Sequence, residues 1–321
     1  MTLTPEIAPV QEESSPDLVQ FQGKGMRITI GVFIVLPMLA VLAAIPVVDG
    51  AEITVECNPE SVTERHVREF TAVGVDRLSF GVQSMVPHVL ESLGRHHDPS
   101  DVRRAVAIAR EGGVRRLNLD LIYGAVSESV EDWITTLDAL VALGPDHVSA
   151  YALTVEKGTP LADDPARHPD DDRQADEYLV AERILTDAGF TNYEISNWAR
   201  PGQECRHNLL YWRQGDYLGF GCAAHSHRGG RRWWNVRTPE RYIEAVETAE
   251  STEASCEVLD GERRRVEGLQ LALRTSAGVP RGSLSGEDVE LLGDLVVVDE
   301  ERITLSVEGR LLANEIAVRL R

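Results

Sequence analysis

Strand-like and helix-like segments alternate along residues 51–195, and this alternation limits the possible folds more than any other feature of the chain. Glycines stand where the helical patterns end: Gly74, Gly112, Gly113, Gly144 and Gly189. Glycine closes a helix readily because it adopts the left-handed backbone conformation at little cost. Since strands that are joined through a helix run parallel, the alternation predicts an α/β fold, either a barrel or an open doubly wound sheet.

The apolar runs and their periods set the bounds of the expected elements. The expected strands are residues 53–57, 77–80, 116–123, 147–153 and 191–195, and the expected helices are residues 63–73, 100–111, 129–143 and 173–188. In both architectures a ligand binds at the carboxyl ends of the strands. Polar residues at those ends are therefore the first candidates for a binding site.

The pattern changes after residue 196. Residues 197–238 are rich in Trp, Arg and Gly, show no helical period and contain several turn signals, which predicts a long loop or a small sheet. Residues 239–321 show helical patterns at 240–250, 261–274 and 309–320 and strand patterns at 295–298 and 302–307. Helices followed by a pair of strands predict a small, winged-helix-like C-terminal extension.

Two segments of different character precede the alternating region. Residues 1–27 are polar and rich in Pro, Glu, Gln and Ser, which predicts a disordered lead. Residues 28–48 are uncharged and mostly apolar, and a run of this length is sufficient to cross a bilayer. Pro37, Pro46 and the β-branched start of the run instead favour a buried strand that leads into a short helix. A membrane anchor, a buried strand and helix, and an artefact of the sequence all stay open.

The formal net charge of −20 argues against nucleic acid as a partner, because nucleic-acid affinity depends largely on Lys and Arg side chains that neutralise phosphates. The cysteines are Cys57, Cys205, Cys222 and Cys256. They are too few and too scattered for a disulfide framework, and the N-terminus shows no export signal with a cleavage site. We therefore expect a cytoplasmic protein, associated with a membrane only if residues 28–48 anchor it.

Polar side chains stand near the ends of three expected strands. Glu56, Gln83 and Asp120 occupy these positions, and Arg95 follows in a loop. A carboxylate at a strand end can accept both hydrogen bonds of a ribose diol, and an arginine can bind a ligand carboxylate through two parallel hydrogen bonds. The alternative is structural: the two carboxylates form ion pairs or caps, and Arg95 is a solvated loop charge.

Cysteine, histidine and aromatic residues gather in the 197–238 segment and just before it. Thiols and imidazoles occur at Cys205, His207, Cys222, His225 and His227, but their spacing is irregular for a structural zinc module. The aromatic residues are Tyr193, Trp198, Tyr211, Trp212, Tyr217, Phe220, Trp233 and Trp234. They form either a wall for a large planar ligand or a small aromatic core. The arginines Arg228, Arg231 and Arg232 are either partners for propionate-type carboxylates or solvated charges.

Six motifs stand in a fixed order along the chain: ECNPESVT at 56–63, RLSFGVQS at 77–84, LGRHHD at 93–98, LNLDLIYG at 117–124, HVSAYALTVEKGTPL at 147–161 and HNLLYW at 207–212. In this order the chain resembles the HemW-type heme chaperones and oxygen-independent coproporphyrinogen oxidases of the radical S-adenosylmethionine (SAM) family. The likeness extends from about residue 51 to the end. It implies a partial six-stranded (β/α) barrel, residues 28–196 here, with a small C-terminal extension.

The resemblance also implies a binding role for particular residues. The SAM contacts of the family fall on Glu56, Gln83, Arg95 and Asp120. HNLLYW resembles the HNxxYW signature of the heme chaperones, which implies that His207, Asn208, Tyr211 and Trp212 bind heme. The implied function is to bind heme and pass it to an acceptor protein, such as a respiratory enzyme. The alternatives are an oxygen-independent coproporphyrinogen III oxidase and a membrane-tethered scaffold without catalytic activity.

The chain departs from the family at several motifs. The CxxxCxxC motif, whose three thiolates bind a [4Fe-4S] cluster in the family, does not occur, and neither does the GGGTP motif that contacts SAM. VFIVLPMLAVL at 32–42 resembles a remnant of that region. Residues 125–127 replace a Pro-Gly turn, and Ala223 replaces a glycine. The family implies SAM and a cluster as cofactors, but we do not expect radical chemistry from this chain.

Overall fold

The computed structural model describes residues 19–23, 26–30, 47–159 and 161–320. Its central element is a sheet with the strand order β3-β4-β5-β6-β8-β7. The strands are β3 (Thr54–Cys57), β4 (Arg77–Gln83), β5 (Arg116–Tyr123), β6 (His147–Ala152), β7 (Thr191–Glu194) and β8 (Asn197–Ala199). Strands β3 to β6 pair in parallel, whereas β8 pairs antiparallel with β6 and β7. The expected α/β class is therefore confirmed, as an open sheet in the described part of the chain.

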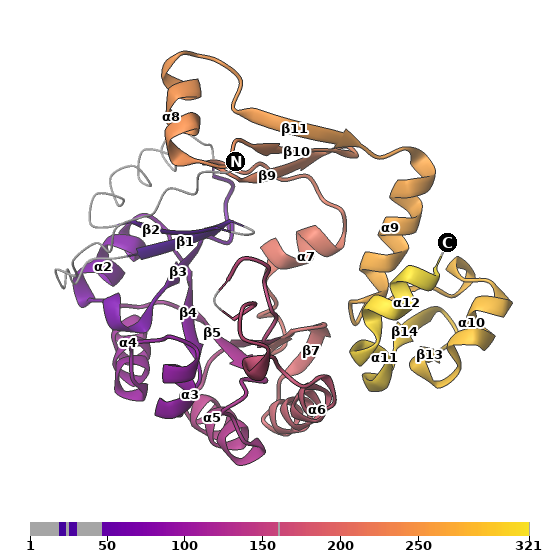
Figure 1. Cartoon of the computed structure of the whole chain (residues 1–321), viewed down its shortest axis with the longest axis horizontal. Coiled ribbons are helices and arrows are strands. Elements are labelled where there is room, and N and C mark those ends of the chain that lie inside the picture. The colour runs from indigo at the N-terminus through magenta and orange to yellow at the C-terminus, as the bar shows by residue number, and fades with distance from the viewer. Residues whose placement is uncertain (1–18, 24–25, 31–46, 160, 321) are drawn as a thin grey trace.

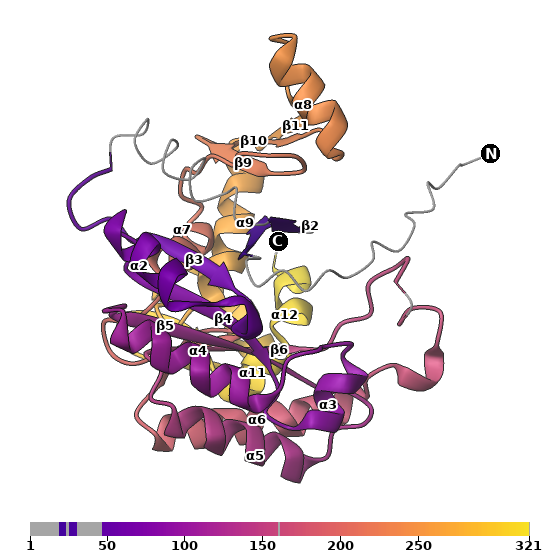
Figure 2. The same ribbon diagram turned by 90° about the vertical axis from the view of Figure 1, so that its left-hand side faces the viewer.

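Helices cover one face of this sheet (Figures 1 and 2). They are α2 (Glu64–Ala72), α3 (Pro87–Ser92), α4 (Pro99–Glu111), α5 (Val130–Ala142) and α6 (Asp171–Asp187). Asp98 and Ser129 form capping boxes that accept hydrogen bonds from the first turns of α4 and α5, so these two helices begin where the sequence predicts. The sequence analysis missed α3, because its single six-residue stretch is too short for a helical period.

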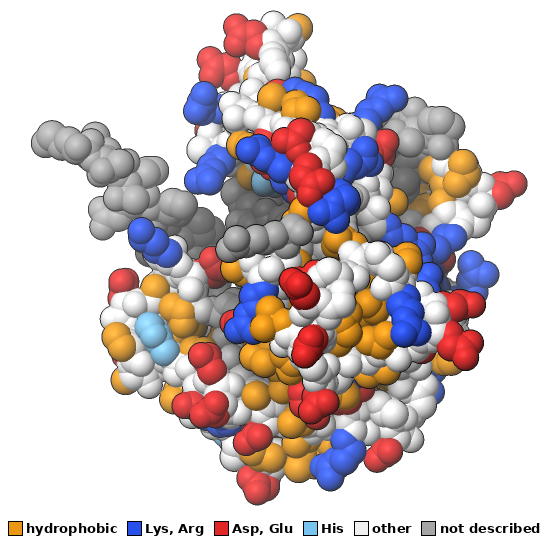
Figure 3. Space-filling model, turned by 90° about the vertical axis from the view of Figure 1, so that its right-hand side faces the viewer, with side chains coloured by type: hydrophobic (Ala, Val, Ile, Leu, Met, Phe, Trp, Pro, Cys, Tyr) orange, Lys and Arg blue, Asp and Glu red, His pale blue; other side chains and the backbone are white. Residues whose placement is uncertain are grey.

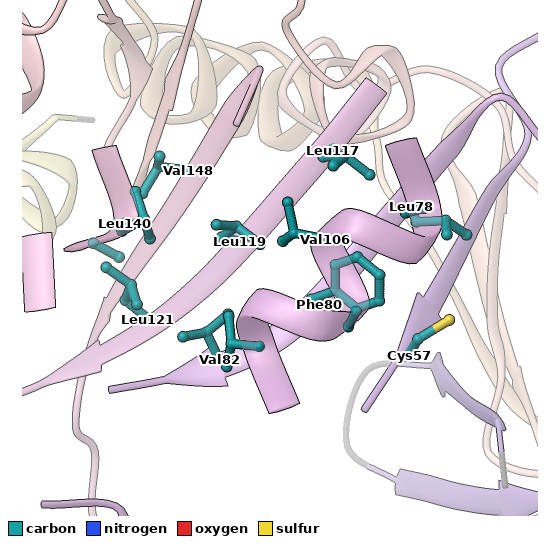
Figure 4. Packing of buried hydrophobic residues seen from close by; sticks show 14 of the residues in the cluster. Cys57, Leu78, Phe80, Val82, Val106, Leu117, Leu119, Leu121, Leu140 and Val148 are labelled. Carbon is teal, nitrogen blue, oxygen red and sulfur yellow. The ribbon is translucent and has the colours of Figure 1, made fainter. Parts of the chain in front are cut away.

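The hydrophobic core lies between the sheet and these helices. Leu117, Leu119 and Leu121 of β5 point toward it together with Leu78, Phe80 and Val82 of β4 (Figure 4). Val106 of α4 and Leu140 of α5 close the core from the helical side. Burying one such side chain stabilises the fold by about 1.5–3 kcal/mol.

The opposite face of the same strands is polar. Successive side chains of a strand point to opposite faces. Ser79, Asn118, Asp120, His147 and Ser149 alternate with the core residues of β4, β5 and β6 and therefore share the inner face. This face carries the candidate site.

The sequence predicts a long loop or a small sheet at residues 197–238, but the structure also has a helix there. The segment contains the helix α7 (Arg206–Trp212), which includes HNLLYW, followed by β9 (His225–Arg228) and β10 (Arg231–Asn235). After α8 (Pro239–Glu247), β11 (Glu253–Val258) completes an antiparallel sheet of order β11-β10-β9. Helix α7 is not predicted from the sequence, because its seven residues show no clear helical period. Strand β11 is not predicted either, because its partner β10 lies on the other side of the expected domain boundary at residue 238.

The C-terminal unit has a hydrophobic cluster of its own around Leu273, Val279, Ile303 and Ile316. Its elements are α9 (Gly261–Leu273), β12 (Val279–Pro280), α10 (Gly286–Leu292), β13 (Val296–Val298), β14 (Arg302–Leu305), α11 (Val307–Leu311) and α12 (Ala313–Arg319). The described residues also form the 3-10 helices η2 (Pro59–Ser61), η3 (Pro165–Arg167), η4 (Arg281–Ser283) and η5 (Gly293–Leu295). Hydrophobic side chains lie among acidic and basic ones on this side of the molecule (Figure 3).

The described part of the N-terminal segment differs from the expected disordered lead. Strands β1 (Val19–Gly23) and β2 (Met26–Ile30) pair antiparallel, and both alternate apolar and polar residues in sequence, as paired strands do. The rest of residues 1–27 and residues 31–46 lie outside the described residues, so most of the 28–48 run does too. None of the helices in the described part of the chain has the length and hydrophobicity to span a membrane.

A buried glutamate and an arginine hold the turn that follows β5. The backbone N–H of Gly124 donates to Glu128 Oε2 at 2.9 Å, and Arg173 donates to the backbone oxygen of Ala125 at 2.7 Å. Burial, together with the charge of Glu177, raises the pKa of Glu128 to about 8, and burial raises the pKa of Glu177 to about 7. Glu128 and Arg173 of α6 therefore hold the turn at residues 125–127, where the family has a Pro-Gly turn.

We predict that Glu128→Gln makes stability less dependent on pH. The pKa of Glu128 is about 8 in the folded state and 4.5 as the ordinary value, so its stabilising contribution is complete below pH 4.5 and is lost as pH rises through 8. A glutamine keeps an acceptor for Gly124 and does not ionise. Between pH 5 and pH 8 the wild type should lose about 4 kcal/mol more stability than the variant, so its Tm should fall by roughly 5–10 °C more.

Glu131→Gln is the matched control, because Glu131 is an exposed glutamate in the first turn of α5, three residues after Glu128. Its melting temperature, measured by circular dichroism, should follow the wild type across the pH range. Equal pH slopes for Glu128→Gln and the wild type would contradict the prediction.

Candidate functional site

A cavity of about 370 Å³ opens at the carboxyl ends of β3 to β6. We call it the strand-end cavity. Its lining residues are Glu56, Cys57, Asn58, Ser79, Gly81, Gln83, Arg95, Asp120, Ile122, Tyr151, Ala152, Leu153 and Thr154. All four residues that the sequence analysis assigned to SAM therefore line the same cavity. Its volume lies within the range of small-molecule sites.

The backbone of Gln83 is strained in a way that directs its side chain. The pairing of β4 with β5 shifts register between Gly81 and Gln83, and Gln83 has a φ of 63° in the left-handed region. A non-glycine residue in this conformation costs about 1–2 kcal/mol. A Cβ atom at Gly81 would lie 2.8 Å from Gln83 Nε2, so the glycine leaves room for the amide. Such strain concentrates at functional sites.

Asp120 is held at the floor of the strand-end cavity by two neighbours. The hydroxyl group of Ser79 donates to Asp120 Oδ2 at 2.7 Å, and Asn118 Nδ2 donates to Asp120 Oδ1 at 2.7 Å. Each carboxylate oxygen has two acceptor positions, so one position on each remains for a ligand. This geometry suits a ligand with two adjacent hydroxyl groups.

The residues of HNLLYW lie on two sides of helix α7, in two different environments. Asn208 and Trp212, four residues apart, line a cleft of about 880 Å³ between the sheet and the C-terminal unit, which we call the interdomain cleft. His207 and Tyr211 form the other such pair, with ring centroids 4.8 Å apart in an edge-to-face contact. Tyr211 in turn packs against Tyr217 at 4.5 Å. The motif therefore offers a cleft-facing amide and indole and a separate imidazole.

A distant glutamate fixes the start of α7. Glu52 Oε1 accepts from the backbone N–H of His207 at 3.2 Å, and Glu52 Oε2 accepts from that of Arg206 at 3.3 Å and from Arg116 at 2.6 Å. Burial alone would raise the pKa of Glu52, but the hydrogen bond from His207 and the charge of Arg116 hold it below its ordinary value. The sequence analysis missed Glu52, since no local pattern connects it with a helix so far along the chain.

Two side chains that line the interdomain cleft have hydrogen-bond donors available for a ligand. Arg274 lines the cleft and donates to the backbone oxygen of Gln270 and to Asn314 Oδ1, and it has no carboxylate partner among the described residues. The indole Nε1 of Trp212 is buried and has no hydrogen-bond partner in the described part of the chain. In contrast, Arg310 is paired with Glu182 at 2.9 Å. Arg274 can therefore pair with a carboxylate of a ligand in the cleft, although most of the other charged side chains that line it are acidic.

Several other candidates from the sequence analysis have structural roles. Trp198 is fully buried and donates to Glu182, and Tyr193 is buried and hydrogen-bonded to His147. Arg231 pairs with Glu253, and Arg232 pairs with Glu257 and Glu267. The interpretation of Arg231 and Arg232 as partners of a ligand carboxylate therefore loses its basis. Ala223 adopts a φ of 56°, the left-handed conformation for which the family has glycine.

The cysteines of this chain do not fit an iron-sulfur cluster. No group of three or more Cys, His, Asp or Glu side chains in the described residues is arranged to hold a metal ion, which also leaves the zinc alternative without support. Cys57 and Cys205 are buried, and burial raises the pKa of both thiols. A thiol with a raised pKa is a poor source of the thiolate that a metal requires.

The chain is similar to several known proteins. Residues 17–140 match the model of the radical SAM superfamily. The heme chaperone HemW of Mycobacterium tuberculosis is 41% identical over 275 residues, which cover 83% of this chain and 70% of that protein. The chain belongs to the HemW family. HemW of Escherichia coli is 40% identical over 223 residues, covering 66% of this chain and 59% of that protein.

A solved structure supports the fold of this HemW family member. The coproporphyrinogen III oxidase HemN of Escherichia coli, a radical SAM enzyme, superposes with a TM-score of 0.76 and covers 88% of this chain and 73% of its own. The sequences are 23% identical, so this likeness concerns the fold alone.

We predict that this chain does not assemble a site-differentiated [4Fe-4S] cluster, because such a cluster needs three thiolates at close spacing. Anaerobic reconstitution with iron and sulfide, followed by iron analysis and electron paramagnetic resonance, should give no stoichiometric cluster signal. A stoichiometric signal that disappears in a Cys57→Ser, Cys205→Ser double variant would show the prediction wrong.

Proposed function

We propose that this chain is a heme carrier that binds heme and passes it to an acceptor protein. The observation that carries the proposal is the position of HNLLYW in α7, beside a cleft of about 880 Å³. Family membership supports it, because the relatives from Mycobacterium tuberculosis and Escherichia coli are heme chaperones.

The side chains of the cleft supply two kinds of contact that a heme needs. The indole of Trp212 is a flat apolar surface against which a tetrapyrrole can stack. The guanidinium of Arg274 is a cation that can pair with a propionate through a charge-assisted hydrogen bond. His207 lies on the same helix but does not line the cleft; its imidazole packs beside Tyr211 and is exposed, so it can ligate the iron of a heme only at that side of α7.

We predict that the cleft side of α7 determines heme affinity. Trp212→Ala removes the stacking surface and should weaken hemin binding about ten-fold or more. Arg274→Ala removes a charged hydrogen bond of about 1.5–3 kcal/mol, which again corresponds to about ten-fold or more. His207→Ala should shift the Soret band of bound hemin if the imidazole ligates iron. Absorbance titration with hemin measures all three effects.

Arg265→Ala is the control for Arg274→Ala, because Arg265 lies on α9, is exposed and pairs only with Glu262 among the described residues. Its hemin affinity should equal that of the wild type. If Trp212→Ala, Arg274→Ala and His207→Ala all bind hemin as the wild type does, heme binds elsewhere and the proposed site is wrong.

The proposal assigns the strand-end cavity to the ribose and carboxylate groups of SAM. Glu56 and Asp120 suit the ribose hydroxyls, and Gln83 and Arg95 suit the other polar groups. The cysteines do not fit the cluster that supplies radical chemistry in the family, so we derive no radical step for this chain. Coproporphyrinogen oxidation, which requires such a step, is therefore the weaker candidate. The membrane-scaffold alternative depends on residues 28–48, most of which lie outside the described residues.

We predict that SAM binds this chain with a Kd weaker than about 1 mM. Each charge-assisted contact that the missing motifs would make is worth about 1.5–3 kcal/mol, so the loss of two or three weakens binding by orders of magnitude. Calorimetry with SAM measures the affinity, and an assay for 5′-deoxyadenosine after addition of dithionite measures cleavage. Micromolar binding that is lost in Asp120→Ala, or 5′-deoxyadenosine above the blank, would contradict the prediction.

A further inference from the structure

A continuous chain of hydrogen bonds crosses the inner face of the sheet from the strand-end cavity to α7. Asn118 Nδ2 lies 2.7 Å from Asp120 Oδ1, and Asn118 Oδ1 lies 2.5 Å from His147 Nδ1. His147 Nε2 lies 2.8 Å from the hydroxyl oxygen of Tyr193, which lies 3.2 Å from Asn208 Nδ2. Asp120 lines the strand-end cavity, and Asn208 lines the interdomain cleft. The two candidate sites are therefore joined by direct contacts.

The partners fix the direction of every bond in this chain. Asn118 Nδ2 donates to Asp120 Oδ1, so the amide oxygen of Asn118 faces His147. His147 Nδ1 must then carry the proton. Burial lowers the pKa of His147 well below its ordinary value, so the ring is neutral and Nε2 accepts from the Tyr193 hydroxyl group. Each donor in the series, from Asn208 onward, points toward Asp120.

Water is excluded from the middle of this chain. Asn118 and His147 are each 2% exposed and Tyr193 is 4% exposed. Hydrogen bonds in such surroundings are stronger than in water and polarise one another when their donors point the same way. The second amide hydrogen of Asn208 is directed to Glu194 Oε1 at 3.2 Å, so both of its donors are engaged. The path from Asp120 to Asn208 therefore runs through Asn118, His147 and Tyr193, which are shielded from solvent.

We infer that this series of hydrogen bonds couples the strand-end cavity to α7. A ligand that is hydrogen-bonded to Asp120 therefore changes the affinity of α7 for heme. The identity of the ligand, heme, rests on the proposed function, whereas the hydrogen bonds are those of the structure. His147 and Tyr193 act as positioning residues, because neither of them lines the cleft or the cavity in the described part of the chain. By thermodynamic reciprocity, heme bound at α7 changes the affinity of the cavity by the same factor.

A double-mutant cycle distinguishes coupling from a purely structural role. Tyr193→Phe removes one hydroxyl group and thereby separates His147 from Asn208 with little change in shape. Asp120→Ala removes the terminal acceptor, and Asp120→Asn is a second variant in case the first does not fold. Hydrogen exchange of the backbone amides of residues 209–213 reports on α7 without any ligand, and it is measured in the wild type, both single variants and the double variant.

In the wild-type background, Asp120→Ala should accelerate exchange in α7 by about two-fold or more, the lower end of the coupling between residues of one network. In the Tyr193→Phe background the same replacement should have no further effect. Ser149→Ala is the control within the network, because Ser149 donates to Asn118 Oδ1 but is not on the path to α7. Tyr242→Phe is the control for loss of a hydroxyl group elsewhere.

Equal effects of Asp120→Ala in the two backgrounds, or no effect on α7 in either, would overturn the inference. Titration with hemin gives the second measurement: Asp120→Ala should change hemin affinity in the wild-type background and not in Tyr193→Phe. If hemin binds to none of the four proteins, the proposed function fails, whereas the exchange measurement still decides the coupling.

Discussion

The structure depends on the alternation of side chains along the parallel strands. In β5, Leu117, Leu119 and Leu121 contribute to the core beneath the helices, and the intervening Asn118 and Asp120 face the other way. The same alternation in β4 and β6 gives one apolar and one polar face to the whole sheet. A shift of one residue in register would exchange the two faces, so burial of the core also places the polar groups.

Helix α7 is held by the polar face rather than by a hydrophobic stripe. None of its side chains is buried over its whole surface, and Cys205 at its N-cap forms no side-chain hydrogen bond with the helix. Glu52 instead accepts from its first backbone N–H groups, and Tyr193 and Glu194 accept from Asn208. An isolated helix of this length is unstable in water, so these contacts determine both its existence and its orientation.

These two features explain what the sequence could predict. The bounds of β5 and the strand-end positions of Glu56, Gln83 and Asp120 follow from local patterns, because period and turn residues are written along a single strand. Helix α7 and its anchor Glu52 do not follow from such patterns, because their contacts join residues far apart in sequence. Asn118 and His147 alternate with apolar residues along β5 and β6, but this local pattern does not reveal their hydrogen-bond partners on other strands.

The two cavities also lie next to each other, since Tyr151 and Ala152 at the end of β6 line both. Ligands in the two sites could therefore influence one another directly across this strand end. Tyr151 is 45% exposed, however, so solvent competes for its contacts, whereas the path through His147 is buried. An exposed contact transmits little free energy because water replaces it readily. The buried path is therefore the one through which occupancy of the cavity can alter the position of Asn208.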